Sequence, residues 1–346
     1  MFDLSPRPHA LPELAELEQL INEGGAHLQA RILCEARVGN RSLPVHAITL
    51  GNPSPKVPAV GFFGGVHGLE RIGAEVVIAY LRTLVKRLAW DKVLHQQLKS
   101  VRLVFMPLVN PGGLLLGTRA NPRGVDLMRN APVEALEPVP FLIGGQRLSA
   151  GLPWFRGIEG AAMECESAAL CALVEEELLS RKFSLAVDCH SGFGTLDRIW
   201  FPLAHSATPI AHLPELHALQ SIFAQTNVHH QYVFEPQSLQ YLTHGDLWDH
   251  LYLRAAADPR RTFLPLTLEM GSWLWIKKNP RQLFSRFGIF NPLIGHRQQR
   301  VMRRHLALLD FFTRAASSHQ RWLPSAAARD QHYADAMARW YRQKSR

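Results

Sequence analysis

The sequence predicts an α/β fold in which a largely parallel β-sheet is covered by helices on both faces. From about residue 58 to residue 314, short runs rich in branched and aromatic apolar residues alternate with longer segments of helical periodicity. This alternation is typical of parallel strands joined by crossover helices. The 346 residues are 47% hydrophobic and 19% charged, which is the composition of a globular protein and excludes general disorder.

The predicted elements follow one another along most of the chain. Leucines at helical spacing predict a first helix, which ends at the Gly24-Gly25 pair. With it, the predicted helices cover residues 11–22, 72–88, 161–181 and 213–227. The predicted strands cover residues 28–38, 45–50, 57–63, 101–108, 185–189 and 263–270. No linker divides the chain, so we expect one domain over residues 1–316, followed by a polar tail over 317–346 that forms a docking helix or frays.

The chain carries a formal net charge of +9, which suits nucleic acid, anionic lipid or small acidic substrates. Its densest basic segment begins at His296 and carries apolar residues at helical spacing, so we expect the charged face of an amphipathic helix. No nucleic-acid-binding motif accompanies this segment, and we expect no nucleic-acid partner.

Several features predict a cytoplasmic protein. The first twenty residues contain acidic residues and prolines where a signal peptide needs a basic start and an apolar run. No apolar stretch reaches the length of a membrane span, so we expect no membrane partner. Four scattered cysteines without a C-x-x-C pair fit a reducing compartment.

Two predicted strands end in residues that suit a metal site. His67 and Glu70 lie three residues apart after the strand AVGFFGG, and His190 ends the strand SLAVDCH. A lone H-x-x-E is commonly a surface pair or a helix cap, but the second histidine gives two imidazoles and one carboxylate with an open fourth position, as one catalytic Zn²⁺ ion requires. Asp188 shares a strand face with His190 and is placed to orient that ligand.

Further candidate residues lie in neighbouring segments. Glu269 ends the apolar strand TFLPLTLEMGS, where a carboxylate serves as a salt-bridged structural residue or as a proton carrier beside the metal. Arg119 and Arg129 lie in a loop rich in Gly, Pro and Asn. One interpretation is that both are surface arginines. The other is that they hold a developing oxyanion and a substrate carboxylate.

Taken together, these segments resemble the M14 (carboxypeptidase A-like) zinc carboxypeptidases in their short bacterial form. HGLE is similar to the family's metal-binding H-x-x-E, DCHSG to its third-ligand motif and TLEMG to its catalytic-glutamate strand. VNPGG and GTRAN followed by GVDLMRN match its asparagine-proline and arginine segments. QYLTHGDLWD keeps the family's intervals between Tyr241, Gly245 and Asp249, and the resemblance covers about residues 57–272.

The resemblance implies a fold, an activity and a set of residue roles. The fold is a three-layer α/β/α sandwich around a mixed, mostly parallel eight-stranded sheet, with a catalytic part over about residues 57–315. The activity is hydrolysis of a C-terminal peptide bond by metal-activated water. The implied roles are zinc binding by His67, Glu70 and His190, general base and acid by Glu269, carbonyl polarisation by Arg119, terminal-carboxylate binding by Arg129, closure over the substrate by Tyr241, and lining of the side-chain pocket by Trp248 and Thr267.

Three departures from the family pattern leave the substrate open. Met128 replaces the usual asparagine beside Arg129, which removes a hydrogen bond of about 1–3 kcal/mol to a buried terminus. Gly112 replaces the aspartate of the N-P-D-G motif, and Trp248 is bulky for a pocket wall, which favours small or extended groups.

These departures keep two alternatives open beside the peptidase. One is a zinc amidohydrolase of N-acyl amino acids, similar to aspartoacylase and succinylglutamate desuccinylase, and within the peptidase class cell-wall peptides are a further substrate. The other is a non-catalytic protein that binds metal or nucleic acid. Glu269 argues against this alternative, because such a protein has no need for a glutamate at the end of this strand.

Overall fold

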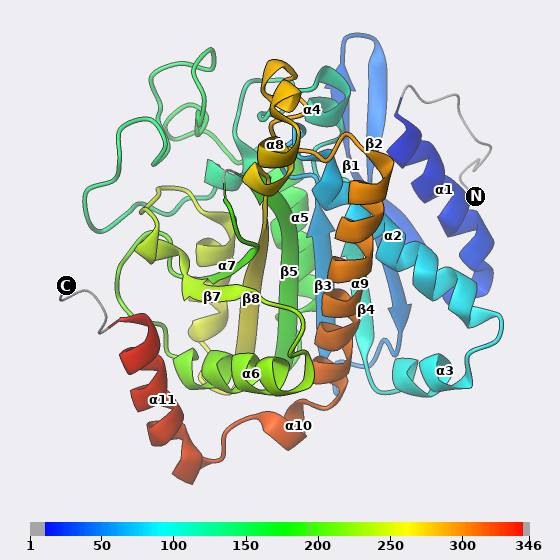
Figure 1. The fold of residues 1–346 in the computed structure, drawn as a ribbon, viewed down its shortest axis with the longest axis vertical. Coiled ribbons are helices and arrows are strands. Elements are labelled where there is room, and N and C mark those ends of the chain that lie inside the picture. Colours follow the sequence, from blue (N-terminus) through cyan, green and yellow to red (C-terminus); the bar gives the residue numbers. More distant parts are fainter. Residues whose placement is uncertain (1–10, 193, 342–346) are drawn as a thin grey trace.

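An eight-stranded β-sheet runs through the middle of the protein in this computed structural model, which describes residues 11–192 and 194–341 (Figure 1). The strand order is β1-β2-β4-β3-β5-β8-β6-β7. Four of the seven neighbouring pairs are parallel, including the central run from β4 to β8, which confirms the expected mixed sheet. The strands are β1 (Gln29–Val38), β2 (Arg41–Gly51), β3 (Ala59–Gly64), β4 (Arg102–Met106), β5 (Phe183–Gly192), β6 (Arg198–Phe201), β7 (Val233–Pro236) and β8 (Thr262–Gly271).

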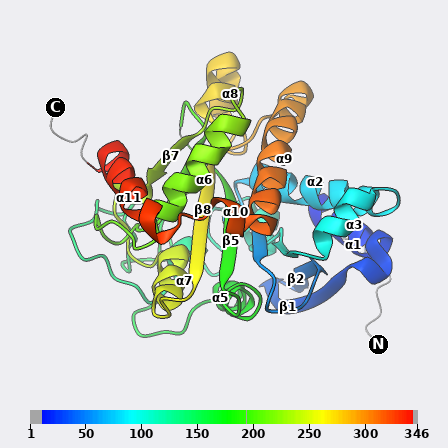
Figure 2. The same ribbon diagram turned by 90° about the horizontal axis from the view of Figure 1, so that it is seen from below.

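Helices cover both faces of the sheet, as Figure 2 shows, so the three-layer α/β/α arrangement is confirmed. Side chains along β3 alternate between the two faces. Val60 and Phe62 pack in the core beneath α1, α2, α6 and α9, whereas Ala59 and Phe63 pack in the core beneath α5 and α7. The helices are α1 (Pro12–Gly24), α2 (Arg71–Leu88), α3 (Lys92–Leu98), α4 (Pro111–Leu116), α5 (Cys165–Glu177), α6 (Leu213–Thr226), α7 (Leu247–Ala256), α8 (Trp273–Lys278), α9 (Gly295–Ser317), α10 (His319–Trp322) and α11 (Ala326–Trp340).

The structure corrects the start of one predicted helix and adds short elements. Helix α5 begins at Cys165 instead of residue 161, because Glu164 is tied to the loop before it. The Glu164 backbone N–H donates to Asn130 Oδ1 at 2.6 Å, and its carboxylate accepts from Asn121 at 2.9 Å. The unpredicted strands β6 and β7 have four residues each, too few for a readable periodicity.

The C-terminal helices pack onto the sandwich. The amphipathic helix predicted from His296 is α9, which buries Val301, Leu309 and Phe312 against the core. Helix α11 packs against α6, and its Trp340 indole donates a 2.7 Å hydrogen bond to the carbonyl oxygen of Phe234 on β7. No helix in the described ranges has the length and apolar character needed to cross a membrane.

Helix α2 approaches the sheet unusually closely at Gly73. A β-carbon at this position would lie 2.1 Å from the carbonyl oxygen of Cys189 on β5, so only glycine fits. This contact brings the first turn of α2 directly onto the strand that carries His190. The turn between β3 and α2, which holds His67 and Glu70, is thereby placed beside His190.

We expect Gly73→Ala to lower the free energy of unfolding by about 2 kcal/mol or more, because the added methyl meets backbone atoms that cannot move aside. Urea denaturation followed by circular dichroism measures this change. Gly295→Ala is the matched control, since a β-carbon at this helical glycine meets no atom within 4 Å, and its stability should change by about 0.5 kcal/mol or less. Equal stabilities of the two variants would contradict the close approach of α2 to β5.

Candidate functional site

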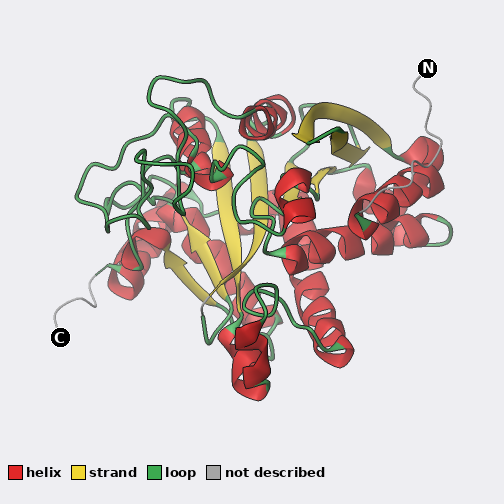
Figure 3. Ribbon diagram, turned by 90° about the horizontal axis from the view of Figure 1, so that it is seen from above, coloured by secondary structure: helices red, strands yellow, loops and turns green. Residues whose placement is uncertain are grey.

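The chemically active side chains gather at the edge of the sheet where the central parallel strands end, a common location for sites in α/β sheets. Figure 3 views the protein from this end and shows that loops cover it. His67 and Glu70 follow β3, His190 lies near the end of β5, and Glu269 lies near the end of β8. Arg119 comes from the loop after α4. The structure therefore brings together residues that lie far apart in the sequence.

His67, Glu70 and His190 form a tight cluster of three buried side chains. Their ligand atoms all lie within 4.8 Å of one another. Nδ1 of His67 lies 2.9 Å from Oε1 of Glu70, and Nδ1 of His190 lies 3.0 Å from Oε2 of the same carboxylate. The two Nδ1 atoms are 3.2 Å apart. One nitrogen from each ring and the carboxylate oxygens thus converge on a single point.

An aspartate holds the outer nitrogen of each ring. Nε2 of His67 lies 3.1 Å from Oδ1 of Asp126, and Nε2 of His190 lies 2.7 Å from Oδ2 of Asp188. When such a ring is neutral, as in a metal complex, the carboxylate accepts the Nε2 proton and the inward Nδ1 keeps the lone pair. The predicted contact between Asp188 and His190 is present.

The cluster is strongly polarised. Burial disfavours charge on His190, but the carboxylates of Asp188 and Glu70 outweigh it and raise the pKa of His190 well above its usual value. Burial likewise opposes charge on Asp126, yet Arg119 and His67 hold the pKa of this carboxyl well below its usual value. Both imidazoles lower the pKa of Glu70 despite its burial. The buried groups thus favour anionic carboxylates beside a positive charge.

The donor set fits a zinc ion. Two imidazole nitrogens and one carboxylate are ligands that Zn²⁺ takes in catalytic sites, where a fourth position stays open. His67, Glu70 and His190 would hold the ion, with Asp126 and Asp188 fixing the two rings.

Glu269 lies on the strand next to His190, with which it pairs in the parallel register of β5 and β8. Gly192 leaves room for its carboxylate, because a β-carbon at position 192 would lie 2.1 Å from Oε1 of Glu269. Burial and the neighbouring Glu70 raise the pKa of Glu269. The side chain nevertheless borders a cavity and is partly exposed.

A cavity of about 1120 Å³ opens over the cluster. Arg119 lies between the ligands and the cavity, where its Nε donates to Asp126 at 2.8 Å and its Nη1 lies 3.3 Å from Glu70. The side chains of Arg129, Tyr241 and Thr267 also line this cavity, as their predicted roles require.

Arg129 is a buried arginine with unused donors. Its guanidinium lies 6.0 Å from the centre of the Tyr241 ring, and its buried Nε donates no hydrogen bond to any described residue. Only 2% of Arg129 is exposed, so its charge is held away from bulk water beside the cavity. Such a group is suited to bind a carboxylate in a fork geometry.

The expectation that Trp248 lines the side-chain pocket is corrected. Its side chain is 2% exposed and packs 5.0 Å from the ring of Phe63, behind the cluster. Its indole N–H donates to Oδ2 of Asp188 at 2.9 Å. Trp248 therefore holds the aspartate that orients His190, and its size gives no information about the substrate.

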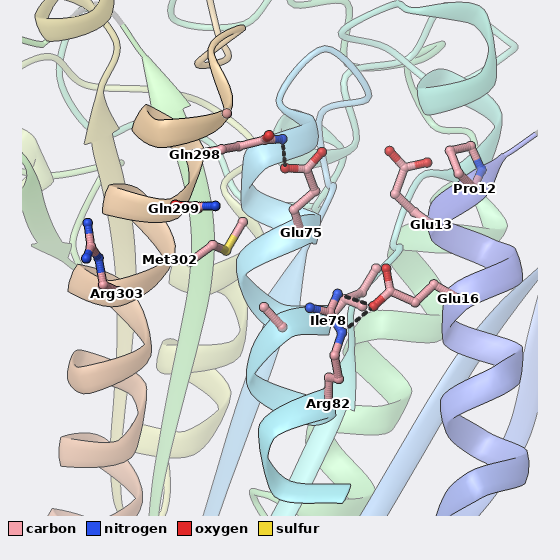
Figure 4. A pocket seen from close by; sticks show the side chains of 12 residues that line it. Pro12, Glu13, Glu16, Glu75, Ile78, Arg82, Gln298, Gln299, Met302 and Arg303 are labelled. Carbon is pink, nitrogen blue, oxygen red and sulfur yellow. Dashed lines mark hydrogen bonds and ion pairs between the residues drawn. The ribbon is translucent and has the colours of Figure 1, made fainter. Parts of the chain in front are cut away.

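A second cavity, of about 630 Å³, lies between α1, α2 and α9 (Figure 4). Its acidic groups already have partners, since Glu16 accepts from Arg82 at 2.7 Å and Glu75 accepts from Gln298 at 2.9 Å. Within the described residues, the one group of His, Cys, Asp and Glu side chains close enough to share an ion is the cluster at the sheet edge. The cavity over that cluster is therefore the candidate active site.

Three residues of this site were not predicted from the sequence. Asp126 is separated from its partner His67 by 59 positions, and no local spacing signals the contact. Arg198 and Trp200 line the cavity from the short strand β6, which was not predicted.

Two carboxypeptidases are similar in sequence to a part of this chain. Carboxypeptidase E of Caenorhabditis elegans is 36% identical over 97 residues, which are 24% of this chain and 21% of that protein. Carboxypeptidase SOL1 of Arabidopsis thaliana is 32% identical over 75 residues, which are 22% of this chain and 15% of that protein. The match thus spans about a fifth or less of these relatives.

Solved structures share the fold. Bovine thrombin-activatable fibrinolysis inhibitor, solved in complex with tick carboxypeptidase inhibitor, superposes with a TM-score of 0.65 at 16% identity over 91% of this chain and 99% of that chain. Carboxypeptidase A from Helicoverpa armigera gives a TM-score of 0.65 at 14% identity over 88% and 72% of the two chains. The sequence model of the zinc carboxypeptidases, peptidase family M14, matches residues 38–262. With this match over more than half of its length, the chain belongs to the zinc carboxypeptidase family.

Proposed function

We propose that this protein is a zinc-dependent metallocarboxypeptidase that hydrolyses the C-terminal amide bond of a peptide. The observation that carries the proposal is that one cavity is lined by the ligand cluster, Glu269 and Arg129, whose buried Nε has no hydrogen-bond partner among the described residues. These groups supply a metal site, a proton carrier and an anchor for a terminal carboxylate. Family membership supports the hydrolase class.

The residues of the cavity divide the reaction between them. Bound Zn²⁺ supplies Lewis acidity, which activates water and polarises a carbonyl. Glu269 takes a proton from the attacking water as the new C–O bond forms, and delivers it to the amine nitrogen when the C–N bond breaks. Arg119 donates to the carbonyl oxygen as negative charge develops there, and Arg129 holds the terminal carboxylate.

Met128 supports a second candidate, the hydrolysis of N-acyl amino acids. It lies in the cavity wall next to Arg129, is 5% exposed and offers no side-chain hydrogen-bond donor to a terminal carboxylate. This weaker recognition of a peptide terminus is compatible with an acyl group in place of a peptide.

A cytoplasmic location stays a prediction. The four cysteines are free thiols in the structure, as the expected reducing compartment requires.

The first test is metal dependence combined with Glu269→Gln. Removal of the metal with a chelator should abolish hydrolysis of the C-terminal amide bond of peptide substrates. Added zinc should restore this activity. Glu269→Gln should keep one equivalent of zinc and lose about 10²–10⁴-fold in kcat, because it cannot carry the proton. Glu175→Gln, on an exposed ion pair of α5, is the control and should keep the wild-type rate. Hydrolysis that persists after chelation would contradict the proposal.

The second test separates the two substrate classes. Peptides with a free C-terminus should be cleaved at least about tenfold faster than the same peptides with an amidated C-terminus, because Arg129 pairs only with the charged form. N-acetyl amino acids are measured in parallel by mass spectrometry. Faster cleavage of the N-acetyl amino acids than of any peptide would favour the amidohydrolase.

Glu269 should also make the stability of the metal-free protein depend on pH. Burial and Glu70 raise the pKa of Glu269 to about 8 in the folded state, whereas an unfolded glutamate titrates near 4.3. The folded protein therefore binds the proton more tightly, and its stability falls as pH rises from about 5 to 8. Glu269→Gln has no carboxyl group to titrate at this position, so its stability should not fall in this way. The Tm of the variant minus the Tm of the wild type should therefore increase with pH in thermal melts. A constant Tm difference from pH 5 to 8 would show that Glu269 titrates normally.

A further inference from the structure

Strands β6 and β8 present two neighbouring rows of side chains on the cavity side of the sheet. In the antiparallel register of β6 and β8, Arg198 lies opposite Glu269 and Trp200 lies opposite Thr267. Directly opposed residues have β-carbons about 4.5–5.5 Å apart and point to the same face. Arg198 is therefore a direct neighbour of the proposed proton carrier.

Arg198 is fixed in place by a carboxylate behind the cavity. Glu235, on β7, accepts at Oε1 from Nη1 of Arg198, from the indole of Trp200 at 3.1 Å and from Gln240 at 2.9 Å. Among the described residues, Nη1 is the one donor atom of Arg198 with a hydrogen-bond partner in the protein. The side chain of Arg198 remains 25% exposed. Its other donors are left for a ligand in the cavity that Arg198 lines.

Two aromatic rings connect Arg198 to the proposed anchor of the terminal carboxylate. The guanidinium of Arg129 lies 6.0 Å from the Tyr241 ring, and the Tyr241 ring lies 6.3 Å from the ring of Trp200 in an edge arrangement. Trp200 is two residues from Arg198 on the same strand face. Aromatic rings thus lie between the two arginines, and a positive charge lies at each end.

The charge of the cavity favours an anionic substrate. Its described lining contains three carboxylates, from Glu70, Asp126 and Glu269, which face the ligand cluster. It also contains five permanent cations, which are Arg119, Arg129, Arg198, Lys277 and Arg286. Glu235, which could attract a basic side chain, is not among the lining residues in the described part of the chain, and its Oε1 already has three donors.

We propose that the C-terminal residue of the substrate carries a carboxylate on its side chain and that Arg198 binds this second carboxylate. The inference rests on the proposed function, because the first carboxylate is the terminus held by Arg129. It narrows the substrate class to peptides or acylated amino acids that end in an acidic residue. Arg198 acts as a specificity residue and moves no proton.

The test compares glutamate with glutamine, which have nearly the same shape and differ in the side-chain charge. The zinc-loaded wild type should cleave peptides ending in glutamate at least about tenfold more efficiently in kcat/KM than the matched glutamine peptides at pH 7. Arg198→Met should reduce this ratio to below about threefold, and Arg198→Lys, which keeps the charge but not the fork, should give an intermediate ratio. Arg254→Gln, on an exposed pair with Glu175, is the matched control and should keep the wild-type ratio.

Binding of free glutamate and free glutamine, measured by calorimetry, provides a readout without turnover, because each amino acid is the product of both candidate reactions. Glutamate should bind the wild type at least about tenfold more tightly than glutamine, and Arg198→Met should abolish the difference.

The outcomes separate the two proposals. Peptide cleavage with a wild-type glutamate-to-glutamine ratio below threefold would overturn the inference and leave the peptidase standing. Selective glutamate binding without any amide hydrolysis would support the role of Arg198 and contradict the proposed hydrolase activity. If Arg198→Met does not fold, the wild-type ratio and Arg198→Lys still decide.

Discussion

Negative charge concentrated at one edge of the sheet is the constraint on which the rest of the site depends. Four carboxylates lie there, three of them buried and the fourth, Glu269, partly exposed, and a buried carboxylate is costly without a partner. Arg119 and the two imidazoles offset part of this charge, which explains why they lie so close to the acids. The same arrangement turns one nitrogen of each ring inward, where a divalent cation would complete the charge balance. The carboxylates are those of Glu70, Asp126, Asp188 and Glu269.

Much of this arrangement could be predicted from the sequence, because it depends on where strands end. His67, His190 and Glu269 each follow an apolar run long enough to be recognised as a buried strand, and parallel neighbouring strands bring their carboxyl ends to the same edge. The helix after β3 was equally readable from its periodicity. Its contact with β5 at Gly73 was not, because a single glycine in a helix does not indicate which backbone it approaches.

The parts that could not be predicted depend on side-chain direction and on short segments. Trp248 keeps a fixed interval from Tyr241, but this interval does not tell which face of α7 the indole occupies, and the structure turns it toward Asp188. Asp126 reaches His67 from an irregular loop with no periodicity. Arg198 lies on a strand of four residues, and its significance appears only when β6 is paired with β8.

The hydrogen bond from Trp340 to the carbonyl oxygen of Phe234 affects how readily the edge of the sheet can pair with another molecule. Strand β7 lies at the margin of the sheet, where unpaired backbone groups can recruit a strand from another molecule. The indole already occupies one of these groups, and α11 is packed on α6 beside it. A strand that paired with β7 at this point would have to displace the Trp340 indole, so α11 reduces the backbone that this edge offers for pairing.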